Sequence, residues 1–519
     1  MGLDSGKDHR LASFCFQALA GGALPMSSSN GNGLILKPAW GLSKCLDLLL
    51  SLSIFLATIL IAGYFSTLGA DARHDGTMFK PAMDVANGAM LFRDTFTGYG
   101  ALVILIQAAS LNIFGKYLIV IKFTTVFFYG LISILLWLIL KRILPRSVAF
   151  VSLGVWIFLA PYYHYTFLPW SSVYALFFQL LGTWLLIESF ERKSNKLVFF
   201  SGVSAALTFW CRQTVGAAMF LAVVVFFFYL FFLKQSNSKD LKKNLFYFLI
   251  GSALIHDLFF TWIVMNHAFS DWWKQNVLLQ FVWSKDTFGI GTNHLLGCLF
   301  PGSHAFAPKL LIWAMLPYAA MCAFIRNFEN KVISLLVFIG LASWLQYYPV
   351  PCIRHFYWGG TPMLGLFALF TYQVTQGLFN NHRRISQKFI EFFSICLFLI
   401  FFLPNVCWRI NEGVLKIIAY RFVLDEPAAL KHMIFTKDEA ATYFSAYRQI
   451  EQYFNDNPKG NVINIGTDPL VLTFDPRIKN FHPMWCGSKI CDKIYPDFSD
   501  QLARYSEKNK PFVITRESR

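Results

Sequence analysis

Residues 46–68 have the sequence LDLLLSLSIFLATILIAGYFSTL, a nearly uninterrupted apolar run. About 20 such residues, folded as a helix, are long enough to cross the roughly 30 Å hydrocarbon layer of a membrane. No small-residue cleavage site follows the run, so we interpret it as an uncleaved membrane anchor and not as a signal peptide. The polar and mixed residues that precede it are expected to form a tail.

Ten further apolar runs follow this anchor along the 519-residue chain. Only 14% of the residues are Asp, Glu, Lys or Arg, 56% are apolar and 56 are Phe, a composition that excludes a soluble globular protein. We therefore predict an all-α polytopic membrane protein with about 11 transmembrane helices. The predicted spans after the anchor are residues 117–140, 147–163, 172–190, 197–211, 215–233, 245–264, 310–325, 332–348, 362–374 and 389–404.

The charges of the connections between these runs predict the orientation of the chain. One set carries 15 Lys and Arg (residues 141–146, 191–196, 234–244, 326–331 and 378–388), and the opposite set carries 3 (residues 164–171, 265–308 and 350–360). Because cytoplasmic loops are enriched in Lys and Arg, the first set is expected to be cytoplasmic. This assignment requires that the apolar residues 99–115 lie at the external interface without crossing the membrane. The N-terminus is then cytoplasmic and the C-terminus external, in a cell membrane or in the endoplasmic reticulum.

Three regions follow from this pattern. Residues 1–45 are a cytoplasmic tail, residues 46–408 a transmembrane domain with an external loop at 69–116, and residues 409–519 an external soluble domain. The last region has a helical pattern at residues 440–454 and strand-like runs at 460–466 and 510–515. We expect a small α/β domain there.

The external loop 69–116 contains the densest polar cluster near the membrane, DARHDGTMFKPAMDVANGAMLFRDTFTGYG (residues 71–100). Asp71 and Asp75 are four residues apart, and on a helix carboxylates at that spacing repel each other. Such pairs are retained where a proton, a metal ion or a cationic transition state needs them. An ordinary solvated loop is the alternative interpretation.

This loop resembles that of the GT-C superfamily of membrane glycosyltransferases, such as the protein O-mannosyltransferases and the aminoarabinose transferases of lipid A. Those enzymes show Asp-Glu-Gly or Asp-Glu-Ala, then Gly-x-x-(Leu/Pro)-Tyr-x-Asp, then a juxtamembrane helix that opens with Pro-Pro-Leu. The corresponding stretches here are residues 74–76 (HDG), 88–94 (GAMLFRD) and 99–102 (YGAL). His74 stands where the family has its usual catalytic Asp, which leaves Asp75 or Asp71 for that role. Residues 208–216 (TFWCRQTVG), 351–369 (PCIRHFYWGGTPMLGLFAL) and 461–477 resemble other stretches of such enzymes.

The resemblance implies a GT-C fold and an inverting transfer of a sugar from a polyprenyl-phosphate donor to a glycan, lipid or protein acceptor outside the membrane. A donor phosphate just outside the hydrocarbon requires cations at that depth, and Arg binds phosphate oxygens with two parallel hydrogen bonds. Snorkelling of each Arg to the interface is the alternative. The catalytic candidates are Asp75, Asp71 and His74, and the candidates for the donor phosphate are Arg212, Arg354, His355 and Tyr357.

Arg93, Asp94 and Asp257 are further candidates. Asp257 lies inside the seventh predicted span, where a carboxylate that faces lipid costs about 2.5–3.5 kcal/mol, so we expect it to face a cavity or a partner. A divalent metal bound by Asp71, His74 and Asp75 is a further hypothesis, although the pattern requires no cofactor. Membrane lipids are expected partners and nucleic acid is not, because the basic residues form short clusters between apolar runs.

Two other classes of protein remain as alternatives. A transporter or flippase of lipid-linked sugars would show internal repeats and charges near mid-membrane in both halves of the chain. We find no such symmetry in the sequence. A non-catalytic subunit of a polysaccharide-assembly system is compatible with everything above.

Overall fold

The computed structural model describes residues 40–234, 237–283, 308–344, 346, 353–379, 385–466, 468–483 and 489–514. The chain divides into two compact units, residues 1–49 and residues 50–519. Within the first unit, the described residues are the start of the helix α2 (Trp40–Ser66). The rest of α2, from Leu50, and all later elements belong to the second unit.

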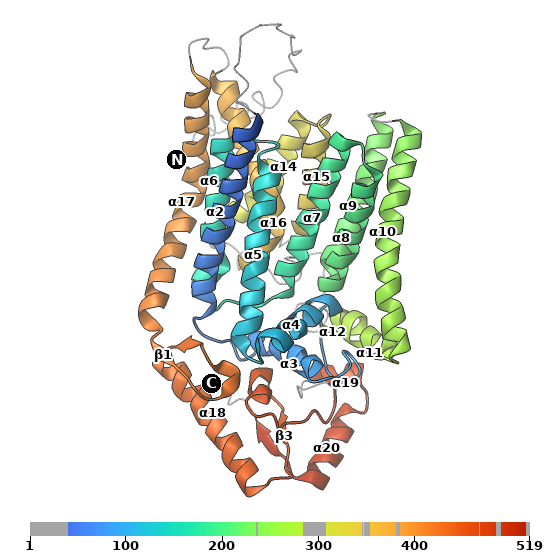
Figure 1. Ribbon diagram of the computed structural model, residues 1–519, viewed down its shortest axis with the longest axis vertical. Coiled ribbons are helices and arrows are strands. Elements are labelled where there is room, and N and C mark those ends of the chain that lie inside the picture. Colours follow the sequence, from blue (N-terminus) through green and yellow to red (C-terminus); the bar gives the residue numbers. More distant parts are fainter. Residues whose placement is uncertain are drawn as a thin grey trace, which may run out of the picture. The chain divides into compact units, whose positions relative to one another are not determined.

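Long apolar helices form a bundle whose members run side by side (Figure 1). Each of the 11 predicted apolar runs lies in or overlaps one of these helices. Seven of the described helices are long and apolar enough to cross a membrane, so the larger number of spans stays a prediction. The bundle consists of α2, α5 (Leu118–Leu140), α6 (Arg146–Phe158), α7 (Ser171–Arg192), α8 (Asn195–Cys211), α9 (Gln213–Phe232), α10 (Ser238–Met265), α14 (Pro308–Arg326), α15 (Lys331–Trp344), α16 (Ile353–Phe379) and α17 (Gln387–Ala419).

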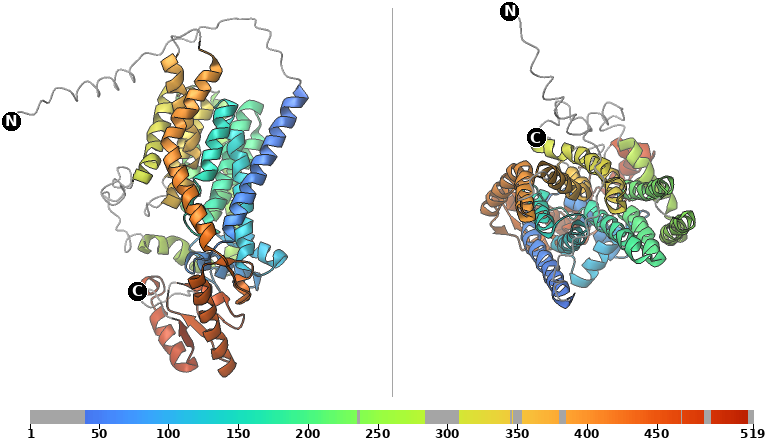
Figure 2. Two further views of the ribbon diagram at one scale, coloured as in Figure 1. Left: turned by 90° about the vertical axis from the view of Figure 1, so that its left-hand side faces the viewer. Right: turned by 90° about the horizontal axis from the view of Figure 1, so that it is seen from above.

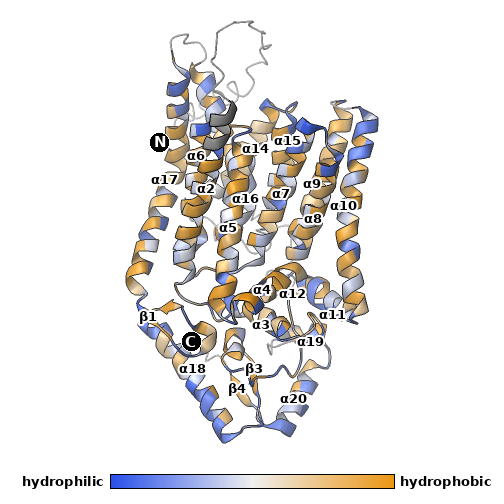
Figure 3. Ribbon diagram, in the orientation of Figure 1, coloured by the Kyte–Doolittle hydropathy of each residue, from blue (hydrophilic) through white to orange (hydrophobic). Residues whose placement is uncertain are grey.

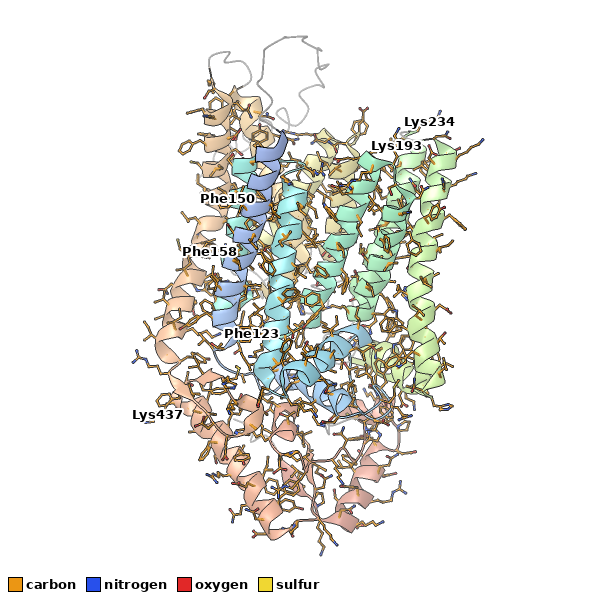
Figure 4. The ribbon with its side chains drawn as sticks, in the orientation of Figure 1. Phe123, Phe150, Phe158, Lys193, Lys234 and Lys437 are labelled. Carbon is orange, nitrogen blue, oxygen red and sulfur yellow. The ribbon has the colours of Figure 1, made fainter. Side chains whose placement is uncertain are left out.

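The outer surface of the bundle is apolar, as Figure 3 shows along the helices. Phe123, Phe150 and Phe158 lie on its flank with 47%, 51% and 37% of their surface exposed (Figure 4). Water does not favour so many exposed aromatic rings, whereas lipid tails do. Lys193 and Lys234 lie at one end of the bundle and Lys437 lies beyond the other end (Figure 4). The apolar belt between these two ends identifies a membrane protein.

Short helices lie across the end of the bundle that is lower in Figure 1. They are α3 (His74–Ala86), α4 (Ala101–Phe114), α11 (Phe269–Trp273), a π-helical turn (Lys274–Leu278) and α12 (Leu279–Trp283). With 14 residues, α4 is about 21 Å long and too short to span the hydrocarbon. It runs across the bundle instead of along it, which agrees with the prediction that residues 99–115 do not cross.

The boundary predicted at residue 409 falls inside α17, which continues to Ala419. Pro404 lies inside this helix without ending it, and Val414, Leu415 and Ile418 continue its exposed apolar face. The helix therefore does not stop where the polar residues begin. The part of the chain with soluble composition starts at about residue 420.

This C-terminal part combines helices with two pairs of short strands and lies beyond the same end of the bundle as α3 and α4 (Figures 1 and 2). Strands β1 (Phe422–Val423) and β2 (Ile434–Phe435) are antiparallel, and β3 (Val462–Asn464) and β4 (Phe512–Ile514) are parallel. Both predicted strand-like runs contain one of the parallel strands. The helices are α18 (Lys437–Asp456), which covers the predicted helical stretch, α19 (Lys489–Ile494) and α20 (Phe498–Asn509).

The C-terminal part contacts the backbone just before α3 directly. The hydroxyl of Tyr443 donates a hydrogen bond to the carbonyl of Ala70 (2.9 Å), and the amide of Leu470 donates to the carbonyl of Ala72 (3.2 Å). Gly76 makes the approach of the two segments possible, since a Cβ atom there would overlap the backbone of Leu470. The start of α3 is thereby held between the bundle and the C-terminal part.

Candidate active site

Two of the predicted catalytic residues are in direct contact at the start of α3. Asp71 Oδ2 lies 2.9 Å from Nδ1 of His74, and Asp71 Oδ1 accepts hydrogen bonds from the amides of Arg73 (3.1 Å) and His74 (2.7 Å). Amides in the first turn of a helix lack partners within the helix, so Asp71 caps α3. The side chains of His74 and Asp71 are 36% and 28% exposed. Both are therefore within reach of a ligand.

Asp75 has a different environment, although it is only four residues from Asp71. Its side chain is fully buried and its Oδ2 lies 2.9 Å from Nζ of Lys122, which is also fully buried. The same oxygen accepts the amide of Asp71 (2.9 Å), and Lys122 also donates to the carbonyl of Gly69 (2.9 Å). Asp75 therefore joins α3 to α5 and is not open to a ligand.

The two carboxyl groups also differ in acidity. Burial opposes the ionisation of Asp71, but the hydrogen bonds and charge of His74, together with the charge of Arg354, lower the pKa of Asp71 to about 2. Burial raises the pKa of Asp75, and the neighbouring Lys122 offsets this effect only in part. At neutral pH Asp71 is an ionised but weak proton acceptor. It is well suited to hold and stabilise an imidazolium ring.

Arg354 lies in the first turn of α16, close enough to Asp71 for the two charges to interact. Its guanidinium is 4.3 Å from the centre of the Tyr165 ring, and its charge acts on the carboxyl group of Asp71. Arg354 also lines a pocket whose walls include the side chains of Tyr129, Tyr162, Phe167 and Trp358. The structure thus places this predicted phosphate-binding cation beside both a carboxylate and an aromatic pocket.

A further guanidinium, that of Arg409 on α17, is buried and was not among the residues predicted from the sequence. Arg409 is 1% exposed, and its Nη1 and Nη2 atoms are buried without a hydrogen-bond partner among the residues that the structure describes. The guanidinium lies 4.6 Å from the centre of the Trp408 ring, and its charge interacts with that of Arg354. A buried Arg with unused donors is costly unless an anion satisfies them.

Lys416, two turns further along α17, adds a third cation that the sequence analysis missed. It is 8% exposed, and its Nζ donates to the carbonyls of Tyr165 (2.9 Å) and Tyr162 (3.4 Å). Its charge interacts with those of Arg354, Lys122 and Asp75. The signal that could have revealed Arg409 and Lys416 is the apolar helical period of residues 404–419, which continues past the predicted domain boundary.

Arg212, the other predicted phosphate-binding cation, joins α8 to α9 and donates a hydrogen bond to the hydroxyl of Ser172. Its charge acts on the hydroxyl of Tyr99. The Tyr99 ring lies 5.0 Å from Trp170, and Trp170 lies 5.4 Å from the His74 ring. The rings of Tyr99 and Trp170 therefore connect the neighbourhood of Arg212 to His74.

His355 and Tyr357 follow Arg354 in the first turns of α16 but point into different surroundings. The His355 ring is half-buried and lies 6.1 Å from that of Trp358. Tyr357 is buried, stacks on Trp156 at 5.7 Å and donates its hydroxyl to the Trp156 carbonyl (3.2 Å). The Tyr357 hydroxyl therefore has a partner inside the bundle.

Arg93, Asp94 and Asp257 lie apart from the Asp71–His74 pair. Arg93 and Asp94 are exposed neighbours joined by two hydrogen bonds of 2.8 and 2.9 Å. Asp257 is exposed on α10 and makes no hydrogen bond or ion pair with any residue in the described ranges. The cavity or partner expected for Asp257 is therefore not found within those ranges.

The hypothesis of a metal bound by Asp71, His74 and Asp75 gains no support from their positions. Among the described residues, no group of three or more His, Cys, Asp or Glu side chains is arranged to hold a metal ion. Asp71 and His74 bind each other and Asp75 is paired with Lys122. We assign no metal ligand to these side chains.

Comparison with solved structures gives the fold. The apo structure of the Archaeoglobus fulgidus oligosaccharyltransferase superimposes with a TM-score of 0.52 and 12% identity, covering 89% of this chain and 69% of that one. ArnT from Cupriavidus metallidurans bound to undecaprenyl phosphate gives a TM-score of 0.53 and 11% identity, covering 90% of this chain and 91% of that one. The chain has the GT-C fold. No protein-family model and no curated protein sequence matches it.

The GT-C fold of this chain is shared over most of its length at very low sequence identity. In this GT-C chain, the connection after the opening helix brings α3, with His74 at its start, to the end of the bundle where the C-terminal part lies. The positions of Asp71, His74, Arg354 and Arg409 are properties of this chain. The chemistry of the site therefore has to be argued from these residues.

Proposed function

We propose that the protein is a membrane glycosyltransferase that uses a sugar linked to a polyprenyl phosphate. The GT-C fold supports this proposal. So do two proteins of similar fold: ArnT bound to undecaprenyl phosphate, and AglB, the oligosaccharyltransferase of Archaeoglobus fulgidus, in complex with an inhibitory peptide and a dolichol-phosphate. The observation that carries it is local: the partly exposed Asp71–His74 pair is within the range of the charge of Arg354, and that charge also interacts with Arg409, whose terminal nitrogens have no partner among the described residues. A base beside a set of cations is what transfer from a phosphate leaving group requires.

In this proposal His74 is the proton acceptor. Asp71 is ionised, so His74 Nδ1 carries a proton and donates it to Asp71, which leaves a lone pair on Nε2. Nε2 takes the proton of the acceptor hydroxyl as that oxygen bonds to the anomeric carbon. The bond from the anomeric carbon to the phosphate oxygen breaks on the opposite face, so the configuration inverts. Asp71 stabilises the imidazolium that forms.

The leaving polyprenyl phosphate gains one negative charge in this step. Arg354 and Arg409 are the cations that we assign to it, because their guanidinium groups are close enough for their charges to interact. Two positive groups that act on the same phosphate favour a dianion over a monoanion. Arg212, which the rings of Tyr99 and Trp170 connect to His74, is assigned to the sugar or acceptor side of the site.

Asp75 is a positioning residue in this scheme. Its ion pair with Lys122 fixes α3 against α5, and the Asp75 carboxylate also accepts the amide of Asp71. We place the reaction on the external side of the membrane, as the Lys- and Arg-rich connections at the other end of the bundle favour. The acceptor is a hydroxyl compound whose identity is left open.

The test uses the full chain in membranes loaded with labelled polyprenyl-phosphate sugars, with sugar transfer measured between pH 4.5 and 8. Replacing His74 by Leu or Asp71 by Asn is expected to reduce the rate by about 10²–10⁴-fold, the usual contribution of a general base. Because protonation of the base removes the lone pair that accepts the proton, the wild-type rate should fall as the pH is lowered. His74→Asp should keep part of the rate and shift this fall to lower pH.

His164→Leu is the matched control, because Nδ1 of His164 is paired with a carboxylate of Glu412 at 3.1 Å with similar exposure. This variant should keep the wild-type pH profile. Asp75→Asn should lower the thermal stability and the rate together without moving the profile, since Asp75 acts through the position of α3. An unchanged rate in His74→Leu would remove His74 from the mechanism.

A further inference from the structure

The helix α10 lies at the edge of the bundle and packs on α8 along one face only (Figure 1). Glycines bring the two backbones together: a Cβ atom on Gly251 would overlap the carbonyl of Phe199, and one on Gly202 would overlap that of Phe248. Such close approach through small residues is typical of helix pairs in membranes. The face of α10 that points into the bundle is therefore occupied by its packing on α8.

The opposite face of α10 is not covered by any part of the chain that the structure describes. Its exposed residues recur every three or four positions, which is the spacing of one face of a helix. They are Phe246, Leu249, Ile250, Ala253, Leu254, Asp257, Leu258, Thr261, Val264 and Met265. Apart from Asp257 and Thr261, the side chains of this open face suit contact with lipid or with another apolar helix.

The depth of Asp257 follows from the charges on α10. Lys242 and Lys243 are exposed near one end of the helix, and the apolar stretch begins at Leu245. About 20 residues cross the hydrocarbon, so the stretch ends near Val264. Asp257 is seven positions from Val264, which at 1.5 Å per residue places it about 10 Å inside the membrane. A side chain as short as that of Asp does not reach the headgroups from this depth.

A carboxylate at this depth requires compensation, because hydrocarbon provides no hydrogen-bond donor. Within the described ranges Asp257 has no hydrogen bond and no ion pair. A second copy of this chain docked symmetrically through α10 would bring one Asp257 against another, which places like charges together. A positively charged side chain on the surface that faces α10 would compensate the charge of the Asp257 carboxylate.

We infer that the open face of α10 binds a transmembrane helix of a different protein that carries a Lys or Arg at the depth of Asp257. Leu254 and Leu258 flank the carboxylate with apolar contact area, and Ala253 and Thr261, one turn away on either side, let the facing backbone approach. The site lies on α10, far along the chain from the residues assigned to catalysis, and does not depend on the proposed reaction.

The experiment uses the full chain reconstituted in phosphatidylcholine vesicles with synthetic leucine-rich transmembrane peptides. Three peptides carry Lys, Leu or Asp about seven residues from one end, each beside a photoreactive leucine. Cross-linking of the Lys peptide to α10, mapped by mass spectrometry, is expected to exceed that of the other two by about tenfold. In Asp257→Leu the yield with the Lys peptide should fall to that of the Leu peptide.

Asp240→Leu is the matched control, since Asp240 is an exposed carboxylate at the polar end of the same helix. This variant should cross-link to the Lys peptide as the wild type does. Asp257→Leu should unfold at or above the wild-type temperature, because it removes an uncompensated charge from the lipid-facing surface. Equal yields for the Lys and Leu peptides would overturn the inference. Cross-links between two copies of the chain that disappear in Asp257→Leu would replace it with self-association.

Discussion

Arg409 places a positive charge inside the protein with its two terminal nitrogens unused by the described residues. The Trp408 ring compensates part of this charge, while Arg354 repels it. Buried groups of this kind are retained where a ligand completes them. We therefore propose that an anion binds at Arg409.

We predict that Arg409→Met leaves the ligand-free protein as stable as the wild type or more stable, because a buried charge that is only partly compensated is replaced by an apolar side chain. Added undecaprenyl phosphate should raise the unfolding temperature of the wild type and raise that of Arg409→Met much less. Thermal unfolding in detergent, with and without the lipid, measures both effects. Arg448→Met, on the exposed face of α18, is the control and should respond to the lipid as the wild type does.

Asp71 and Asp75 illustrate how little a residue's type says about its role. Both are carboxylates in one short polar segment, and the sequence left open which of them acts in catalysis. Asp71 caps α3 and meets His74 at the surface, whereas Asp75 is fully enclosed with Lys122. The difference arises because Lys122 comes from another helix, α5, and nothing in the local sequence places it there.

At the scale of elements, α3 is the part on which the site depends. It carries His74 and Asp75, is held to α5 by the ion pair with Lys122, and touches the C-terminal part at Gly76. Movement of this helix by a fraction of an ångström would change the distance between His74 and a bound substrate. The contact between α3 and the segment around Leu470 therefore matters for activity as well as for stability.

We expect Gly76→Ala to destabilise the protein by about 1–3 kcal/mol, because the new methyl group overlaps the backbone of Leu470 and forces the two segments apart. Thermal unfolding should show this loss, and limited proteolysis should cut the C-terminal part faster. Gly154→Ala is the matched control: Gly154 is also helical but has open space around it, so alanine there should be neutral or stabilising. Equal effects of the two substitutions would contradict the role given to Gly76.

At the scale of the whole molecule, the second unit has two chemically different ends. Lys193 and Lys234 lie at one end, and α3, α4 and the C-terminal part lie at the other (Figures 1 and 4). The positive-inside rule assigns the first end to the cytoplasm. The Asp71–His74 pair would then face the external side.

This orientation predicts opposite labelling of two exposed serines after replacement by cysteine. Ser445→Cys, on α18, should react with a membrane-impermeant maleimide in intact cells, and Ser238→Cys, at the start of α10, should react only after permeabilisation. The wild type, labelled in parallel, corrects for its native cysteines. The reverse pattern would place the site in the cytoplasm.

The sequence was sufficient for the properties that local chemistry determines. Long apolar runs form helices wherever lipid is the solvent, so the helices of the bundle, the crosswise α4 and the strands of the C-terminal part agree with their predicted positions. Composition alone did not predict where α17 ends. The sequence changes from apolar to polar near Arg409, but the helix continues to Ala419. A helix that leaves the membrane can continue as a helix.

Only the tertiary structure decided which charged groups act together. It buried Asp75 with Lys122, left Asp71 and His74 partly accessible, and brought Arg354 on α16 within the range of the charge of Arg409 on α17. It also turned Asp257 outward on α10. Apolar length and charge bias are read residue by residue along the chain, whereas the burial and pairing of a charge depend on neighbours that folding supplies from elsewhere.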